Sequence, residues 1–194
     1  TDGSLQTDGG LSVVKDAVFG DDVKLLSDDA VLSFGADQDV KITHDPDDGL
    51  LIKSTATADD NPLLITLQTG ETDLAADDVI GKIAFQAPDE GTGTDAILVS
   101  AAIQAIAEGD HSSSSNATTL SFMTGASEAA AAKLNLTSGG DVKVLTDNAS
   151  IFFGADSEIE LRHVNDTGII LKHTATADDQ PIVLTLQTGE TDMA

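Results

Sequence analysis

The chain has 194 residues, no cysteine and a formal net charge of −25, from 34 acidic and 9 basic residues. This charge excludes nucleic acid and anionic membrane surfaces as expected partners, because both require clustered Lys and Arg. Disulfide and thiol chemistry are excluded as well. Six Phe without Trp or Tyr disfavour a glycan-binding face, which uses broad rings with a polar tip.

No apolar run approaches the ~20 residues of a membrane helix, so no membrane insertion is predicted. The acidity favours solvated acidic faces over a dedicated divalent-cation site.

A long internal repeat organises the chain. Residues 22–75 align without a gap on residues 141–194 at an offset of 119, and 30 of the 54 aligned positions are identical. A shorter version of the unit, residues 16–25, resembles residues 29–42. Repetition at a fixed period is typical of modular and solenoid arrays. We therefore expect the chain to be an interior piece, about one and a half units of a longer array.

The repeat predicts four segments along the chain. They are a partial repeat at 1–21, the first full copy at 22–75, an intervening β-rich block at 76–140 and the second full copy at 141–194.

Within each copy, alternating apolar and polar residues predict short strands, at Asp39–Thr43 and Glu158–Arg162. Pro, Asn, Asp and Gly predict the turns that separate them. These turns are expected at 44–49, 58–62, 163–168 and 177–181.

Apolar triplets recur in each copy. Three consecutive apolar residues put apolar side chains on both faces of a strand, which must then be covered from both sides. In a piece of this size we expect the second cover to come from another copy of the chain, so self-association is predicted. The triplets are at 50–52, 63–65, 169–171 and 182–184.

The intervening block begins with a predicted strand at 79–87 and a loop at 88–95. Residues 96–108 are ambiguous, because Ser100, Gln104 and Glu108 recur at helical spacing while Ile97, Val99, Ala101 and Ile103 alternate as on a strand. The polar segment 109–118 predicts a loop, residues 119–124 a strand, and residues 127–133, "SEAAAAK", a helical turn by propensity alone.

The stretches "LSFGADQDVKITHDPDDGLLIKSTA" and "IFFGADSEIELRHVNDTGIILKHTA" resemble repeats in long tail-fibre and virion structural proteins of marine bacteriophages. The block from Asp77 to Glu128 is similar to another segment of those fibres, which likewise precedes a "KLNLTSGGDVKV"-type stretch, here Lys133–Val144. The resemblance covers nearly the whole chain.

The resemblance implies an all-β, repetitive, intertwined homotrimeric fibre of short strands with a β-sandwich-like intervening block. It implies strand for residues 96–108 and frequent assistance from a C-terminal intramolecular chaperone that lies outside this piece. It carries over no catalytic residues. The expected function is the shaft of a bacteriophage tail or virion fibre, without enzymatic activity.

The expected partners are further copies of the chain, virion tail or capsid proteins, and the host cell surface through a tip outside this piece. The expected location is the virion, outside the cell. The alternative is an acidic, calcium-stiffened repeat of a bacterial surface adhesin, which also fits the charge.

Candidate chemistry was sought at the histidines. His44 and His163 occupy equivalent positions before a turn, and on a threefold fibre they could face the axis and bind a metal or anion, although local hydrogen bonding is the favoured explanation. His173 aligns with Ser54, so the unit does not require it. His111 lies in a Ser-rich loop, whose composition explains its serine neighbours without a hydrolase.

The repeat bears on whether the acidic turns bind calcium. "DPDDG" faintly resembles an EF-hand loop, but its counterpart "VNDTG" lacks the first acidic position. The pairs Asp59–Asp60 and Asp178–Asp179 persist in both copies, where a turn is favoured over a cation site. No catalytic, cofactor-binding or metal-binding residue is therefore predicted, and no cofactor is expected.

Overall fold

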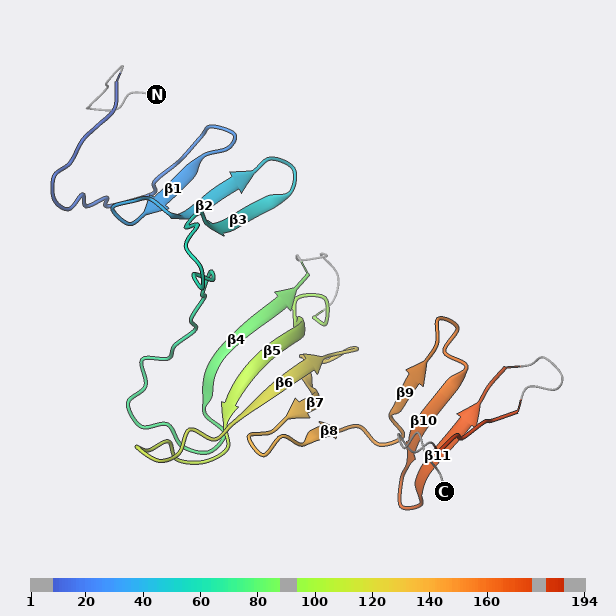
Figure 1. Cartoon of the computed structure of the whole chain (residues 1–194). Helices are drawn as coiled ribbons and strands as arrows, with labels where there is room; N and C mark the ends of the chain where they lie inside the picture. The colour runs from blue at the N-terminus through green and yellow to red at the C-terminus, as the bar shows by residue number, and fades with distance from the viewer. Residues whose placement is uncertain (1–8, 88–93, 176–180, 187–194) are drawn as a thin grey trace, which may run out of the picture. The chain divides into compact units, whose positions relative to one another are not determined.

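A computed structural model describes residues 9–87, 94–175 and 181–186. Every regular secondary-structure element in these residues is a β-strand, which confirms the all-β prediction. They form three separate antiparallel sheets (Figure 1). The chain divides into two compact units, residues 1–65 and 66–194. Among the described residues no helix could span a membrane.

The first copy of the repeat folds into a three-stranded sheet. It consists of β1 (Val31–Phe34), β2 (Val40–Asp45) and β3 (Gly49–Ser54), in the order β1-β2-β3. The predicted strand at 39–43 and turn at 44–49 are confirmed, since β2 ends at Asp45 and β3 begins at Gly49.

The second copy folds in the same way, into β9 (Ser150–Phe153), β10 (Ile159–Val164) and β11 (Gly168–His173). Its register is that of the first copy shifted by 119, so that Phe153 pairs with Ile159 as Phe34 pairs with Val40. The predicted strand at 158–162 and turn at 163–168 are confirmed.

The turns explain why the two sheets agree. Left-handed backbone recurs at equivalent positions, where Gly, Asn and Asp tolerate it best. Gly49 and Gly168 have φ of 120° and 141°, and Asp47 and Asp166 have φ of 67° and 57°. These residues fix each hairpin locally, so both copies adopt the same register.

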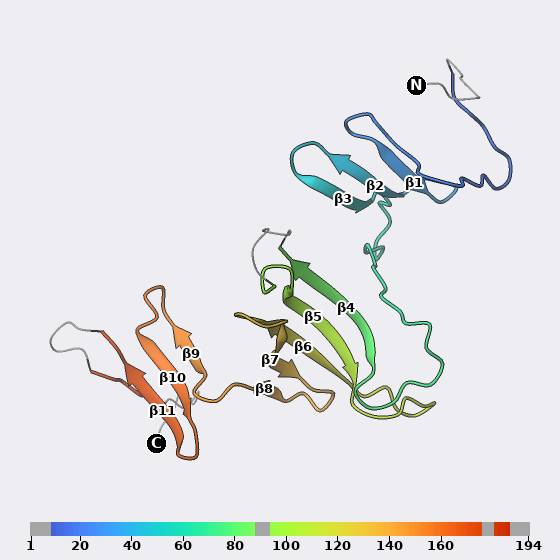
Figure 2. The same cartoon turned by 180° about the vertical axis from the view of Figure 1, so that it is seen from behind.

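The intervening block forms a five-stranded sheet in chain order. Its strands are β4 (Val79–Gln86), β5 (Val99–Ala107), β6 (Thr118–Thr124), β7 (Ala131–Leu136) and β8 (Val142–Val144). The ambiguous segment 96–108 therefore supplies a strand, and the predicted strands at 79–87 and 119–124 are confirmed. The expectation of a β-sandwich-like block is wrong for the described residues, since they form one sheet (Figure 2).

Two predictions of local structure are wrong. The helical turn expected at 127–133 is absent, because residues 131–133 belong to β7, which pairs with β6 and β8. Sheet pairing there overrides the helix propensity of alanine. The triplets 63–65 and 182–184 lie outside the strands, because a strand needs a neighbour for its backbone groups and neither triplet is paired with one in the described residues.

The remaining elements agree with expectation or fall outside the description. The turn at 58–62 is confirmed around Asp59 and Asp60, the triplets 50–52 and 169–171 lie in β3 and β11, and residues 109–117 form a loop with one isolated bridge, Ser112 to Ser115. Most of the loop at 88–95 and of the turn at 177–181 lies outside the described residues.

Candidate functional site

The five-stranded sheet carries a polar row across all its strands. Lys82 pairs with Gln104, Gln104 with Ser121, Ser121 with Asn135, and Asn135 with Lys143. Directly paired residues of antiparallel strands point to the same face of the sheet. These five side chains therefore share one face, which we call the polar face.

The rows on either side of it point to the opposite face, because successive residues of a strand alternate between faces. Every residue in both rows is apolar or glycine, and none of the chain's 34 acidic residues is among them. We call this surface the apolar face of the five-stranded sheet. One row is Ile83, Ile103, Phe122, Leu134 and Val144, and the other is Gly81, Ala105, Leu120, Leu136 and Val142.

Within a single copy, central side chains of the polar face are buried while large side chains of the apolar face are exposed to solvent. This is the reverse of the usual distribution of polar and apolar side chains. On the polar face, Gln104 and Ser121 are only 9% and 0% exposed, whereas Phe122 and Val142 on the apolar face are 42% and 68% exposed. Buried polar side chains normally need partners, yet Ser121 Oγ and Asn135 Oδ1 have none in the single copy. The apolar face is thus covered only in part, by Leu67 next to Gly81, and most of its large side chains stay exposed.

Each three-stranded sheet also has an apolar face. The six apolar positions on this face stay apolar in both copies, although five of the six residues differ. On the other face, by contrast, Lys41 becomes Glu160 and Ser33 becomes Phe152. The six positions of the first copy are Leu32, Phe34, Val40, Ile42, Leu50 and Ile52. Those of the second copy are Ile151, Phe153, Ile159, Leu161, Ile169 and Leu171.

No substantial core compensates for these open faces. Among the described residues, the buried hydrophobic side chains are Ala102 and Ala107, while large apolar side chains are exposed on all three sheets. Contiguous exposed apolar surface marks an interaction site. The three apolar faces are therefore the candidate functional surfaces of this chain.

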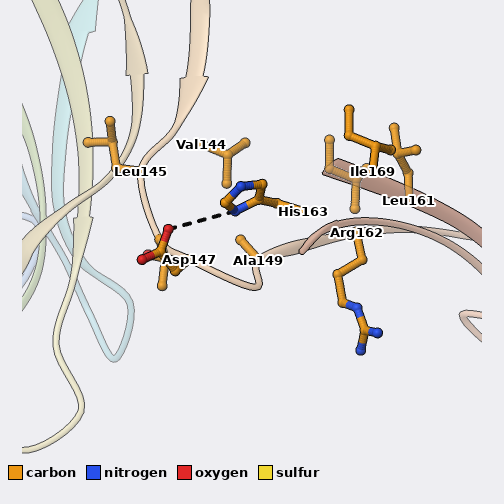
Figure 3. Close-up of a pocket in the computed structure, with 10 residues that line it drawn as sticks. Val144, Leu145, Asp147, Ala149, Leu161, Arg162, His163 and Ile169 are labelled. Atoms are coloured by element: carbon orange, nitrogen blue, oxygen red, sulfur yellow. Dashed lines mark ion pairs between the residues drawn. The ribbon is translucent and has the colours of Figure 1, made fainter. Parts of the chain in front are cut away.

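A groove lies at the start of the second copy. About 300 Å³ in volume, it lies between the end of β8 and the β9–β11 sheet, and His163 and Asp147 stand at it with Nδ1 and Oδ1 3.7 Å apart (Figure 3). Both side chains are largely exposed, so this pair is a weak contact. The other side chains that line the groove include Val144, Leu145, Ile151, Leu161 and Ile169.

The structure places His44 and His163 on the apolar faces, paired with Leu50 and Ile169. No group of three potential metal ligands occurs in the described part of the chain, so there one copy alone does not assemble three ligands around either histidine. Binding of a metal or anion by these histidines from several copies stays a prediction.

The other candidate residues serve local structure. Asp60 adopts φ of 60° in an exposed turn next to Asp59, as a turn residue does; Asp178 and Asp179 lie outside the described residues. The backbone N–H of His111 donates to the Leu74 carbonyl at 2.9 Å, and its ring lies 3.5 Å from the Thr118 hydroxyl.

His173 lies 3.6 Å from Glu158, between Nε2 and Oε2. The contacts of His111 and His173 are thus local ones.

Glu108 makes a set of contacts that its sequence spacing does not indicate. Its carboxylate accepts hydrogen bonds from the Ser138 hydroxyl at 2.5 Å, the Thr119 hydroxyl at 2.6 Å and the Ser138 backbone N–H at 2.8 Å. These bonds, led by the Ser138 hydroxyl and aided by Lys143, lower the pKa of Glu108 to about 2. Glu108 thereby ties the β7–β8 turn to the end of β5; no local pattern announces a contact 30 residues away.

Glu160 also makes a contact that the sequence did not indicate. Its side chain is 8% exposed, accepts a hydrogen bond from the Ser150 hydroxyl at 2.6 Å and lies 3.9 Å from Arg162 Nε. The aligned first-copy residues are Lys41, Val31 and Thr43. This polar contact therefore belongs to the second copy alone.

No protein-family model, curated protein or solved structure gives a significant match to this chain. The three apolar faces and the repeat are therefore the features that point to a function.

Proposed function

We propose that this chain is a structural fibre protein, the repetitive shaft of a bacteriophage tail or virion fibre that projects a host-recognition tip. The observation that carries the proposal is the set of three open apolar faces in a chain whose described residues bury only two alanines as hydrophobic core. A second support is the 119-residue repeat, whose two copies fold alike.

The shaft would act by geometry. Three copies cover the apolar faces that one copy leaves open, and burying such a face contributes about 25 cal/mol per Å² of apolar surface. Pairing between chains also satisfies strand edges that would otherwise promote aggregation. Adding units lengthens the fibre without new contacts, because each repeat supplies the same surfaces.

The proposed partners follow from this role. They are further copies of the chain in a homotrimer, tail or capsid proteins at one end, and the host surface through a tip at the other, all outside the cell on the virion. The work of a shaft is mechanical and needs neither catalytic residues nor a cofactor.

The first experiment is the solution mass of the chain by light scattering, at about 0.15 M salt, where surface charges are largely screened beyond about 8 Å. The measurement is made with and without a calcium chelator. A trimer that survives chelation supports the shaft.

A stable monomer at all accessible concentrations contradicts the shaft. A trimer that dissociates on chelation instead supports the calcium-stiffened adhesin repeat, and directs mutation to Asp59 and Asp60.

A further inference from the structure

The three apolar faces differ in width, and this difference restricts what can cover them. The five-stranded sheet has apolar rows that run from β4 to β8, whereas each repeat sheet has rows that cross only three strands. A face is fully covered only by a surface at least as wide. The chain itself carries one wide face between two narrow ones, in a fixed order along the sequence.

We propose that each sheet packs through its apolar face against the same sheet of other copies, in parallel and in register, so that β4–β8 meets β4–β8 and each repeat sheet meets its own equivalent. This inference rests on the proposed fibre function and specifies its interface. Rotational symmetry supports it, because parallel copies around one axis direct equivalent surfaces to that axis.

The areas of the apolar faces indicate that several faces of one chain form the interface together. With strands about 4.8 Å apart and about 3.3 Å per residue, the wide face covers about 500 Å² and each narrow face about 300 Å². A stable interface needs about 800 Å² per partner. The wide face alone falls short of this requirement, and the three faces of one chain exceed it.

The net charge restricts where two copies can meet. Any two copies repel each other, since each carries a net charge of −25, and their contact must therefore avoid carboxylates. The apolar rows contain none, while Lys82 and Lys143 stand exposed on the opposite face of the wide sheet. Copies that meet through the apolar faces keep their acidic residues apart and remove exposed apolar side chains such as Leu50, Val142 and Ile169 from solvent.

The two copies of the repeat add an independent argument. All six apolar positions stay apolar across the repeat, whereas Lys41 becomes Glu160 and Thr43 becomes Arg162 on the other face. A surface that meets the same kind of partner in both copies retains its chemistry. The other face retains it only in part, at Leu51 and Ile170 and at Lys53 and Lys172. The apolar face is the one that behaves as an interface.

Single cysteines test the face, since the chain has none of its own. Phe122→Cys and Met123→Cys are adjacent on β6, the central strand, and point to opposite faces. After treatment with a short bifunctional thiol cross-linker, we expect a covalent dimer as the major product for Phe122→Cys and only background for Met123→Cys. Labelling both variants with a monofunctional maleimide after denaturation checks that both thiols are intact.

A second matched pair, Ile42→Cys and Lys41→Cys on β2, repeats the test in the first copy. It replaces the β6 pair if circular dichroism shows that a β6 variant does not fold. The double variant Ile42→Cys with Leu161→Cys tests the register. In-register parallel packing gives links between two residues 42 and between two residues 161, identified by peptide mapping.

The outcomes separate this inference from the fibre proposal. If the parent chain is a trimer but Met123→Cys or Lys41→Cys gives the major cross-link, the apolar-face interface is wrong and the fibre proposal survives. Predominant links from residue 42 to residue 161 overturn the parallel register. A monomeric parent overturns both proposals together.

Discussion

The two copies of the repeat agree in their hairpins and differ just before them. Over residues 29–54 and 148–173, both copies share strands, register and left-handed turn positions. Upstream, Val142–Val144 form β8, whereas the aligned residues Val23–Leu25 form no strand. The two segments differ in sequence only at Leu25 and Val144. Local sequence therefore does not decide which of them becomes a strand.

The two segments differ in whether a strand lies beside them to pair with. In the second copy, β8 pairs with β7, and the Leu145 N–H donates to the Lys133 carbonyl at 2.9 Å. The five-stranded block lies before the second copy, and no described strand stands in that position for the first. Three residues cannot hold an extended conformation without such a partner, because the conformational entropy of each costs about 1–2 kcal/mol. The start of the second copy is thus paired with the five-stranded block that precedes it.

The largest expected effect comes from removing the partner strand's donor. Asn135→Pro takes away the backbone N–H of the residue that pairs with Lys143, and proline is not tolerated in the middle of a sheet. We expect destabilisation of about 2–4 kcal/mol and amide exchange at 142–145 as fast as at 23–26. Asn135→Ala keeps the N–H and is the control; slow exchange at 142–145 in the proline variant would show that β8 does not depend on β7.

Glycine substitutions test the regions in which the copies agree. Gly49→Ala and Gly168→Ala each place a side chain on a backbone with φ above 100°, which costs about 1–3 kcal/mol. The two costs should be similar, because the two turns are equivalent. Gly109, which has no positive φ and no atom within 4 Å of an added Cβ, supplies the control as Gly109→Ala. Denaturant unfolding measures all three, and a neutral Gly168→Ala would break the equivalence.

A third change should give the first copy the additional strand that only the second copy has. Replacing residues 1–21 with a copy of residues 76–140 places a β7-type strand before Val23. We expect amide exchange at Lys24 and Leu26 to slow by at least about tenfold. The same chain with the proline change in the added block is the control. Unchanged exchange rates would mean that the block alone does not create the strand.

Acid titration isolates Glu108, which acts only in the block before the second copy. Because the pKa of Glu108 is lowered to about 2 from 4.5, its ionised form stabilises the fold fully above about pH 4.5, and this contribution is lost as pH falls towards about 2. Glu108→Gln should flatten the stability profile in that window and leave its shape unchanged above it. Thermal unfolding between those pH values checks this; an identical slope in the variant would contradict the assignment.

The smallest effect is expected at the groove. Asp147→Asn removes the ion pair with His163, which is 3.7 Å long and largely exposed. Such pairs contribute at most about 0.5–1 kcal/mol, so the melting temperature should hardly change. Asp28→Asn is the matched control in the first copy. A large loss of stability with Asp147→Asn alone would show that the groove does more than its exposure indicates.

The sequence by itself determined the β class, the period, the hairpins of both copies and the strands at 79–87 and 119–124. These depend on alternation and on turn residues such as Asp47 and Gly49, whose conformational preferences act over a few positions. It also indicated, through the apolar triplets, that one copy would leave apolar surface uncovered, as Leu50 and Ile169 are.

Only the tertiary structure decided which segments find a partner. It placed residues 131–133 in β7 against their helix propensity, left the triplet at 63–65 outside any strand, and distinguished β8 from residues 23–25. It also aligned ten residues from five strands into one apolar face and brought Ser138 to Glu108. The physical reason is that strand pairing and side-chain rows are set by non-local neighbours, which a local pattern does not contain.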